Sequence, residues 1–304
     1  MALSLTADEI RLQCRYELEL RRQRGFAAEA EEILRYGAFV GSTVECHPFL
    51  ERAMDHGRAH IIAMEEAGRS VHNGTVILAD RLGGSKGRFD RIWHAPEGGI
   101  WGCLIHANTL LSSSRNLISL AVGVACCEAV QEIGMAAELR WVNDVLVNGR
   151  KAAGFLIEGF VSPSYREEYN LIGFGININN IQFPSDLRDI AVALAEISEH
   201  PLDLNLFARI FLAKLAYNFG LLYYQEEREM GREDGCEGKR EHPLLQRWRE
   251  LSDTIGRRVI FGLDVLKNPQ YPAVVLGISE AGGLILRLDD GHEKTEYCGE
   301  IRYL

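Results

Sequence analysis

The sequence changes character at Gly256, so the parts before and after this residue are expected to fold differently. After Gly256 the chain consists of short apolar runs, and the clusters Ala281-Gly282-Gly283 and Asp289-Asp290-Gly291 separate the later runs. Short strands divided by tight turns are typical of small antiparallel barrels. We therefore predict a separate β-barrel domain over residues 255–304.

The preceding part, residues 36–225, mixes strand and helix patterns. Its clearest strand-like runs are residues 76–79, 100–105, 153–158 and 170–176, and its clearest helix-like runs are residues 116–133 and 204–224. Strand-like runs have a high content of β-branched and aromatic residues, whereas the helix-like runs repeat their apolar residues every three or four positions. This mixture predicts an α+β domain in which helices flank a mixed β-sheet.

Two charged segments frame this central domain. Residues 1–35 are rich in charged and helix-forming residues, which predicts a solvated helical extension. Residues 226–254 begin with a charged, glycine-containing stretch as far as His242, which predicts an exposed loop. The apolar residues that follow predict a short linker helix.

The overall charge argues against nucleic acid as a partner. The 304 residues include 33 Lys and Arg against 43 Asp and Glu, a formal net charge of −10. Chains that bind nucleic acid usually carry a positive surface instead. Residues 1–35 are also too few for a complete three-helix DNA-reading domain. We predict no nucleic-acid partner.

The cysteines and the apolar runs predict a cytoplasmic protein with no membrane partner. Seven cysteines are scattered without a Cys-x-x-Cys pair, and no Cys/His spacing is typical of a zinc site. Reduced thiols suit the cytoplasm, and we predict no metal centre. The apolar run Leu117–Val130 is too short to span a bilayer, and the N-terminus lacks the pattern of a signal peptide.

A basic, glycine-rich cluster at residues 83–93 is the densest candidate for binding chemistry. Glycines let a ligand approach backbone N–H groups, and Arg binds phosphate or carboxylate through paired hydrogen bonds. Lys86, Arg88 and Arg91 supply the positive charge around Gly87. The cluster predicts a flexible loop that closes over an anion. A solvated surface turn could have the same composition, and the loop lacks the Gly-Lys-Ser/Thr ending of a P-loop.

Two further clusters are weaker when each is taken alone. Residues 140–144 (Arg-Trp-Val-Asn-Asp) predict a strand that ends in a polar turn, and Asn148-Gly149 predicts a hairpin that presents Lys151. An ordinary hairpin with a surface lysine has the same pattern. Residues 173–177 (Gly-Phe-Gly-Ile-Asn) predict a strand end with a tight turn. They do not form a dinucleotide-binding loop, because Ile178 stands where the last glycine is required.

Together and in this order, the three clusters resemble the motifs of the biotin–protein ligase family. The family's Gly-Arg-Gly-Arg-x-Gly-Arg-x-Trp loop corresponds to residues 85–93, where Ser85 and Asp90 replace glycines. Its Lys-Trp-Pro-Asn-Asp, Lys-x-x-Gly-x-Leu-x-Glu, Gly-x-Gly-Ile-Asn and Ser-Thr-Asn motifs correspond to residues 140–144, 151–158, 173–177 and 42–44. The second of these is intact, whereas the last has lost its Asn.

The resemblance implies a biotin/lipoate ligase-like catalytic domain over residues 36–225 that binds biotin and ATP, and an SH3-like barrel over residues 255–304. It implies that the protein activates biotin to biotinyl-5′-AMP and transfers it to a lysine of a biotin carboxyl carrier protein, as a biotin–[acetyl-CoA-carboxylase] ligase does. Biotin and ATP would be substrates and Mg²⁺ a cofactor. A homodimer is common in such a family.

The resemblance also implies roles for individual residues. Lys151 and Arg88 would be the catalytic cations. Biotin would contact Ser42, Thr43, Lys86, Gly87, Arg88, Lys151 and Gly154. ATP would contact Arg88, Arg91, Trp93, Asn143, Asp144, Lys151 and Asn177. For Asp144, orienting Mg²⁺ or the loop and capping a turn are equally compatible with the sequence.

Two other functions stay compatible with these residues. A lipoate or octanoate ligase or transferase of the same fold is favoured slightly by Gly83-Gly84, whereas the basic loop ending in Trp93 and the C-terminal barrel argue against it. The altered motif residues also allow a non-catalytic regulator that binds biotinyl-AMP.

Overall fold

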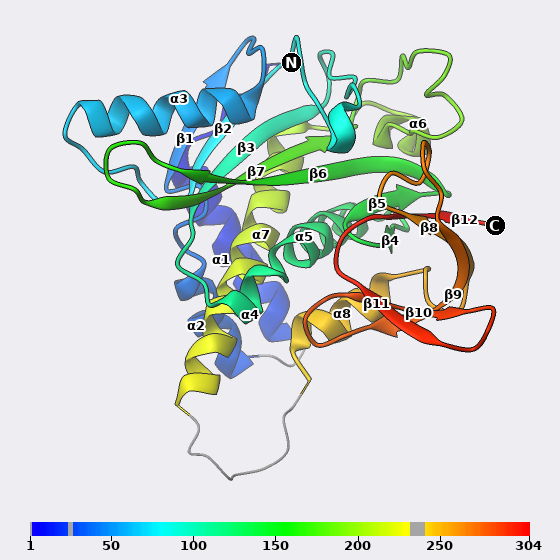
Figure 1. Ribbon diagram of the computed structural model, residues 1–304. Helices are drawn as coiled ribbons and strands as arrows, with labels where there is room; N and C mark the ends of the chain where they lie inside the picture. Colours follow the sequence, from blue (N-terminus) through cyan, green and yellow to red (C-terminus); the bar gives the residue numbers. More distant parts are fainter. Residues whose placement is uncertain (1, 24–26, 232–240) are drawn as a thin grey trace.

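Two β-sheets and the helices packed on the larger one make up the protein (Figure 1). The computed structural model describes residues 2–23, 27–231 and 241–304. The larger sheet has seven strands in the order β1-β2-β3-β7-β6-β5-β4, and the smaller has five in the order β11-β10-β9-β8-β12. The predicted α+β architecture with a mixed sheet is confirmed, since β1 and β2 pair parallel while the other neighbours in the larger sheet pair antiparallel.

The larger sheet contains the strand-like runs of the sequence, each extended by one or more residues at one or both ends. Its strands are β1 Thr43–His47, β2 Thr75–Ala79, β3 Ile100–Ala107, β4 Glu138–Arg140, β5 Asp144–Val147, β6 Arg150–Val161 and β7 Glu168–Ile176. Asn148 and Gly149 have positive φ angles of 50° and 75°, as a tight turn between β5 and β6 requires. The hairpin predicted at Asn148-Gly149 is therefore confirmed.

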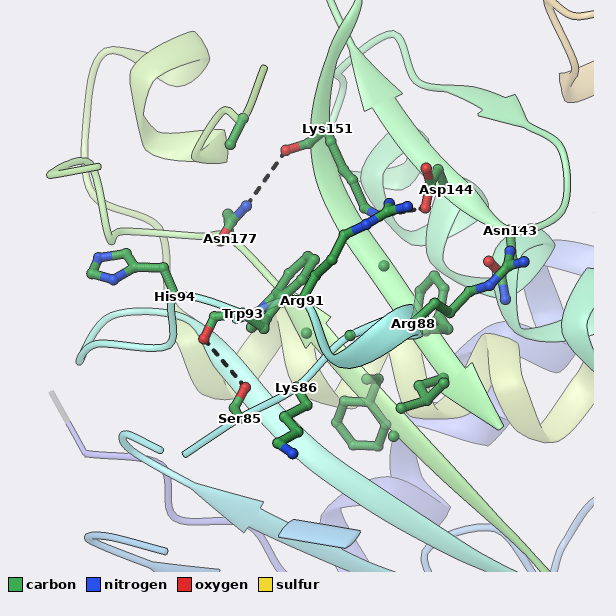
Figure 2. A pocket seen from close by; sticks show the side chains of 18 of the residues that line it. Ser85, Lys86, Arg88, Arg91, Trp93, His94, Asn143, Asp144, Lys151 and Asn177 are labelled. Carbon is green, nitrogen blue, oxygen red and sulfur yellow. Dashed lines mark hydrogen bonds and ion pairs between the residues drawn. The ribbon is translucent and has the colours of Figure 1, made fainter. Parts of the chain in front are cut away.

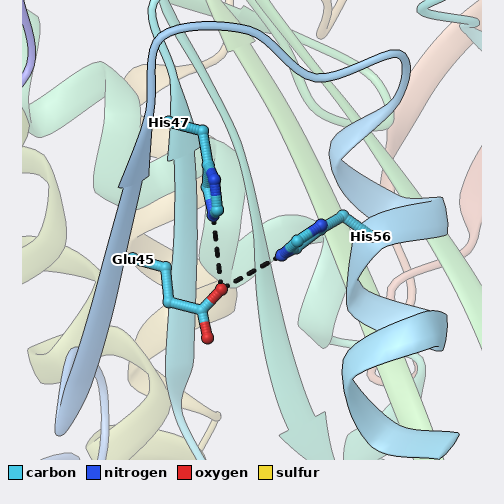
Figure 3. Close-up of side chains that lie close together, drawn as sticks. All are labelled: Glu45, His47 and His56. Atoms are coloured by element: carbon cyan, nitrogen blue, oxygen red, sulfur yellow. Dashed lines mark hydrogen bonds and ion pairs between the residues drawn. The ribbon is translucent and has the colours of Figure 1, made fainter. Parts of the chain in front are cut away.

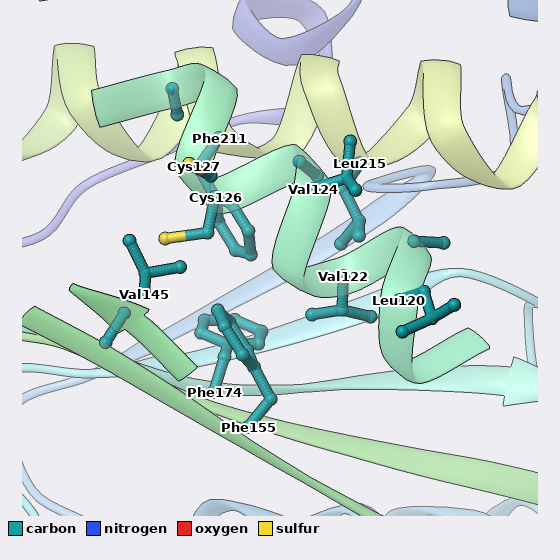
Figure 4. Packing of buried hydrophobic residues seen from close by; sticks show 14 of the residues in the cluster. Leu120, Val122, Val124, Cys126, Cys127, Val145, Phe155, Phe174, Phe211 and Leu215 are labelled. Atoms are coloured by element: carbon teal, nitrogen blue, oxygen red, sulfur yellow. The ribbon is translucent and has the colours of Figure 1, made fainter. Parts of the chain in front are cut away.

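Helices cover both faces of this sheet. They are α1 Ala7–Gln23, α2 Ala27–Tyr36, α3 Ala53–Glu66, α4 Ser112–Arg115, α5 Ile118–Glu132, α6 Leu194–Ser198, α7 Leu204–Met230 and α8 Pro243–Leu251. The main core lies between the sheet and α5 with α7, where Phe155 and Phe174 meet Phe211 (Figure 4). A smaller core lies between the opposite face and α3, which the sequence patterns did not predict.

The N-terminal helices are not a solvated extension, contrary to the prediction for residues 1–35. Helix α1 packs on α7 and buries Glu17 and Arg21 with Lys214. Lys214 forms ion pairs of 2.5 Å with Glu17 and 2.6 Å with Glu132. Charged residues had suggested exposure, but here they face one another inside the protein, where each charge has an opposite partner.

The long helix α7 extends further than the predicted residues 204–224. Glu226, placed in the exposed loop by the sequence, is buried and accepts a hydrogen bond of 2.8 Å from the backbone N–H of Leu111. Most of the predicted loop, residues 232–240, lies outside the described residues. Helix α7 is long and apolar enough to cross a membrane, but 83% of its most apolar window is buried in the protein, as in the core helix of a globular fold.

The C-terminal part is a five-stranded antiparallel sheet, consistent with an SH3-like domain. Its strands are β8 Arg258–Gly262, β9 Tyr271–Ile278, β10 Leu284–Leu288, β11 Glu293–Glu296 and β12 Glu300–Tyr303. Within residues 241–304 the ladder contains no pairing of β11 with β12 that would close it into a ring. Trp141 donates a hydrogen bond of 3.3 Å to the carbonyl of Gly282, so this sheet rests against the polar turn between β4 and β5.

Candidate active site

A cavity of about 460 Å³ lies where the basic loop 83–93, strands β5 to β7 and the C-terminal sheet meet (Figure 2). Its volume is within the range of small-molecule sites. Ten of the residues proposed from the sequence line it: Lys86, Gly87, Arg88, Arg91, Trp93, Asn143, Asp144, Lys151, Gly154 and Asn177. The three clusters that were separate in the sequence therefore share one pocket.

Trp93 lies over a pair of glycines on neighbouring strands. Gly154 of β6 and Gly175 of β7 are directly opposite each other in the sheet. A Cβ on Gly175 would lie 2.5 Å from the indole nitrogen of Trp93, and one on Gly154 would lie 3.1 Å from Cζ3 of the same ring. The two glycines therefore form a seat that only a residue without a side chain provides. The buried indole N–H lies against Gly175 and has no hydrogen-bond partner among the described residues.

Replacing Gly175 with alanine is expected to displace Trp93 and weaken ligand binding without unfolding the protein. The new methyl group cannot coexist with the present position of the Trp93 ring, so the ring must shift. We expect the KM for the small-molecule substrate to rise about ten-fold, the effect of losing well-packed ring contacts worth about 1.4 kcal/mol. Steady-state kinetics and thermal unfolding would measure both. Gly277→Ala is the matched control, since a Cβ there meets nothing within 4 Å; equal KM values in the two variants would contradict this seat.

Lys151 is held in the cavity by a carboxylate. Its ammonium group lies 2.5 Å from Oδ1 of Asp144, whose Oδ2 accepts a hydrogen bond of 2.7 Å from Arg140. Burial opposes ionisation of Asp144, but the charges of Lys151 and Arg140 prevail and lower its pKa to about 2. Asp144 is therefore a permanent anion that positions two cations. Its place at the start of β5, beside the N-terminal end of β6, follows from the short hairpin.

The basic loop is a small hairpin that the C-terminal sheet holds. The backbone N–H of Gly87 donates 2.7 Å to the carbonyl of Arg91, and the turn between them includes Phe89 at φ 57°. Arg88 donates a 2.6 Å hydrogen bond to the carbonyl of Gly299, and Arg91 pairs with Glu300 at 2.6 Å and with Asp264 at 2.5 Å. These contacts with the C-terminal sheet could not be predicted from the sequence of the loop alone.

The opposite end of the cavity is apolar. Ala53, Met54, Leu82 and Leu156 line it, and a Cβ on Gly173 would lie 2.6 Å from the sulfur of Met54. Sequence reasoning missed this wall because helix α3 was not predicted. Arg52, just before α3, also lines the cavity and pairs with Glu158 of β6 at 2.9 Å. The last residue of the Lys-x-x-Gly-x-Leu-x-Glu motif thus anchors α3 to the sheet.

Ser42 and Thr43 are not at the cavity, which corrects their predicted role in biotin binding. Ser42 donates a 2.9 Å hydrogen bond to the carbonyl of Asn73, and the hydroxyl of Thr43 lies 3.1 Å from Nδ1 of His72. Both stand where β1 begins, whereas the cavity lies beyond the ends of β1 and β2, where Leu82 lines it. The match of only two motif residues therefore assigned the biotin contacts to residues outside the cavity.

The two asparagines of the motifs are buried at the cavity. Asn177, 3% exposed, donates a 3.4 Å hydrogen bond to the carbonyl of Lys151 and accepts one of 2.9 Å from Asn180. These bonds tie the end of β7 to the start of β6. Asn143 packs against α5, where a Cβ on Gly123 would lie 3.2 Å from its Cα. Both therefore shape the wall of the cavity.

The fold and the cavity define a small-molecule-binding domain built on a mixed sheet, and part of this domain is similar to a known family. Residues 60–177 match the family described as Biotin/lipoate A/B protein ligase family. The match covers the stretch from helix α3 to the end of strand β7 and includes the basic loop and Lys151.

Several characterised proteins resemble the chain. It is 29% identical over 201 residues, 62% of this chain and 60% of the other, to the bifunctional ligase/repressor BirA of Bacillus subtilis. It is 26% identical over 163 residues, 52% of this chain and 58% of the other, to the biotin–[acetyl-CoA-carboxylase] ligase of Mycobacterium tuberculosis. In both cases the matched region spans less than two thirds of the relative's length.

A solved structure supports the fold. The biotin protein ligase of Aquifex aeolicus, in complex with biotin and ATP, superposes with a TM-score of 0.66 at 21% identity. The superposition covers 86% of this chain and 98% of the Aquifex chain. The likeness supports the fold described above.

Proposed function

We propose that this protein is a biotin–protein ligase that activates biotin with ATP and attaches it to a lysine of a biotin carboxyl carrier protein. The observation that carries the proposal is the placement of Lys151 and the basic loop in one cavity with an apolar far end. Such a cavity suits an acid with an apolar chain whose carboxylate must meet a phosphate. The family domain and relatives named as biotin ligases support the same activity.

In the proposed first step, a carboxylate oxygen of biotin attacks the α-phosphorus of ATP and pyrophosphate leaves. The apolar wall around Met54 and Leu156 holds the acid, and Lys151 lies at the polar end. A fixed ammonium group stabilises the negative charge that develops on the phosphoryl oxygens. Trp93 on its glycine seat covers the site and excludes water, which would otherwise hydrolyse the mixed anhydride.

In the second step, the amine of the carrier's lysine attacks the carbonyl carbon of biotinyl-5′-AMP and AMP leaves. The amine loses its proton on forming the amide. Arg88 and Arg91 are proposed to contact the phosphates, as the sequence predicted. Since both now contact the C-terminal sheet, that role requires them to exchange Gly299, Glu300 and Asp264 for the nucleotide.

Mg²⁺ is proposed only as the cation bound to the phosphates of ATP. Hard cations prefer carboxylate and phosphate oxygens. Asp144 does not fit as a direct ligand, because Lys151 and Arg140 already engage its two oxygens. We therefore assign no step to the metal. The division of the chain at residues 36–225 and 255–304, the carrier protein as partner, a homodimer and a cytoplasmic location are retained as parts of this proposal.

Mass spectrometry of the products tests the proposal against its alternatives. The purified protein is incubated with ATP and Mg²⁺ and with biotin, lipoate or octanoate in separate reactions. We expect pyrophosphate and an acyl-adenylate with biotin alone, and repeated turnover when a biotin carboxyl carrier domain is added. Adenylate from lipoate or octanoate alone would indicate a lipoate-type enzyme. Binding of biotinyl-AMP without labelling of the carrier would indicate a regulator.

A further inference from the structure

Three histidines converge on one glutamate outside the cavity, between strand β1 and helix α3. Figure 3 shows this glutamate, Glu45, with two of them, His47 and His56. Glu45 and His47 are two positions apart on β1, so their side chains leave the same face of the strand. His56 and His60 are four positions apart on α3 and therefore lie on one face of the helix. The two patterns bring three of the chain's nine histidines together.

The contacts have the spacing of a metal-binding donor set. Nε2 of His47 and Nε2 of His56 lie 3.3 Å and 3.1 Å from the same oxygen of Glu45. One donor atom from each of these three residues lies within 4.8 Å of the others. Nδ1 of His60 lies 3.0 Å from the other oxygen of Glu45. An ion at the centre of the first three would need only small side-chain movements to reach bonding distances of about 2.0–2.2 Å.

The cluster is also suited to such an ion by its surroundings. The four side chains are 21% to 32% exposed, so an ion can enter while the strand and the helix still fix the donors. Without an ion, three imidazoles compete for one carboxylate, and their hydrogen bonds and charges help to lower the pKa of Glu45 although burial opposes this.

We propose that Glu45, His47 and His56 bind a divalent transition-metal ion, Zn²⁺ in the first place, and that His60 orients the Glu45 carboxylate. Two imidazoles and one carboxylate are a common zinc set that leaves a fourth position for water. A ligating carboxylate is usually fixed by a further hydrogen bond, which His60 supplies. The Cys/His spacing rule missed the site because the ligands come from a strand and a helix, with a carboxylate among them.

The ion would fasten the edge strand β1 to α3. Because β1 pairs with only one neighbour in the larger sheet, it has fewer ties than the inner strands. Met54, which stands two positions before His56 on α3, lines the apolar end of the cavity. Metal binding is thus expected to stabilise the fold near that wall. The proposal does not depend on the biotin ligase activity.

Zinc binding to the full-length protein tests the site directly. The chelator-treated protein is titrated with Zn²⁺ by calorimetry, and Co²⁺ is added separately as a spectroscopic probe. We expect one tight site per chain, visible Co²⁺ absorption bands typical of four ligands, and a higher Tm with Zn²⁺. The double variant His47→Gln/His56→Gln should lose this site, and His60→Gln should weaken it about ten- to a hundred-fold.

Two control variants separate this site from other donors. His292→Gln removes an exposed histidine elsewhere, and Cys46→Ser removes the exposed thiol between the two strand ligands. Both should bind Zn²⁺ as the parent does. The Tm of each chelated variant should equal that of the chelated parent, which shows that the fold is intact. No stoichiometric Zn²⁺ binding, or equal binding by the double variant, would overturn the proposal.

Discussion

Replacing Lys151 with alanine should slow formation of biotinyl-adenylate by roughly two to three orders of magnitude, the usual effect of removing one charge-stabilising group from an active site. Lys151 is the cation that the Asp144 carboxylate holds in the cavity, 2.5 Å away. The fold should survive, because the structural bonds of this residue are made by its backbone. Its N–H donates to the carbonyl of Ile190 at 2.8 Å, and its carbonyl accepts from Val192 at 3.0 Å.

Biotin-dependent exchange of pyrophosphate into ATP measures this step without the carrier protein. Lys151→Arg keeps a charge at the site but changes its shape, so it should retain more activity than Lys151→Ala. Lys294→Ala is the matched control, since that lysine is half exposed and pairs with Glu296 in the C-terminal sheet. An exchange rate in Lys151→Ala within a factor of two of the parent would refute the assigned role.

Replacing Lys214 with methionine should lower the free energy of unfolding by about 3–5 kcal/mol, the cost of leaving buried charges without a partner. Lys214 is 1% exposed and pairs with Glu17 and Glu132. The same network continues through Arg21 to Glu128, at 2.5 Å. Burial opposes ionisation of Glu128, but the Arg21 charge foremost keeps its pKa at about 2. Its carboxylate therefore stays charged at neutral pH and depends on its cations.

Urea unfolding followed by circular dichroism measures the loss. Adding Glu132→Gln to Lys214→Met should restore part of the stability, because Glu132 loses its ion pair with Lys214 whereas Glu17 keeps Arg21 at 2.6 Å. Lys294→Met, at an exposed Lys–Glu pair, should change the free energy of unfolding by less than about 0.5 kcal/mol. A loss below about 1 kcal/mol in Lys214→Met would show that the cluster is hydrated or rearranges.

Local pattern was sufficient for most elements and for the residues of the three clusters. The strand-like runs of β6 and β7, the helical repeat in α5 and the Asn148-Gly149 turn depend on neighbours in the chain, and each was predicted. The sequence pattern gave a wrong prediction where the burial of a segment differs from what its composition suggests. The charged helix α1 was expected in solvent, yet it buries Glu17 and Arg21. Helix α3 was missed altogether.

What the sequence by itself determined is therefore the α+β class, the small C-terminal β-domain and the membership of Lys151, Trp93 and the basic loop in one site. What only the tertiary structure decided are contacts between distant segments. These include the ion pair between Arg91 and Glu300 of the C-terminal sheet and the place of Met54 in the cavity wall. They also include the position of Ser42 and Thr43 outside the cavity. The physical reason is the distance along the chain over which each kind of interaction acts. Turn and helix preferences act between residues a few positions apart, whereas ion pairs and cavity walls depend on where the whole chain places its segments.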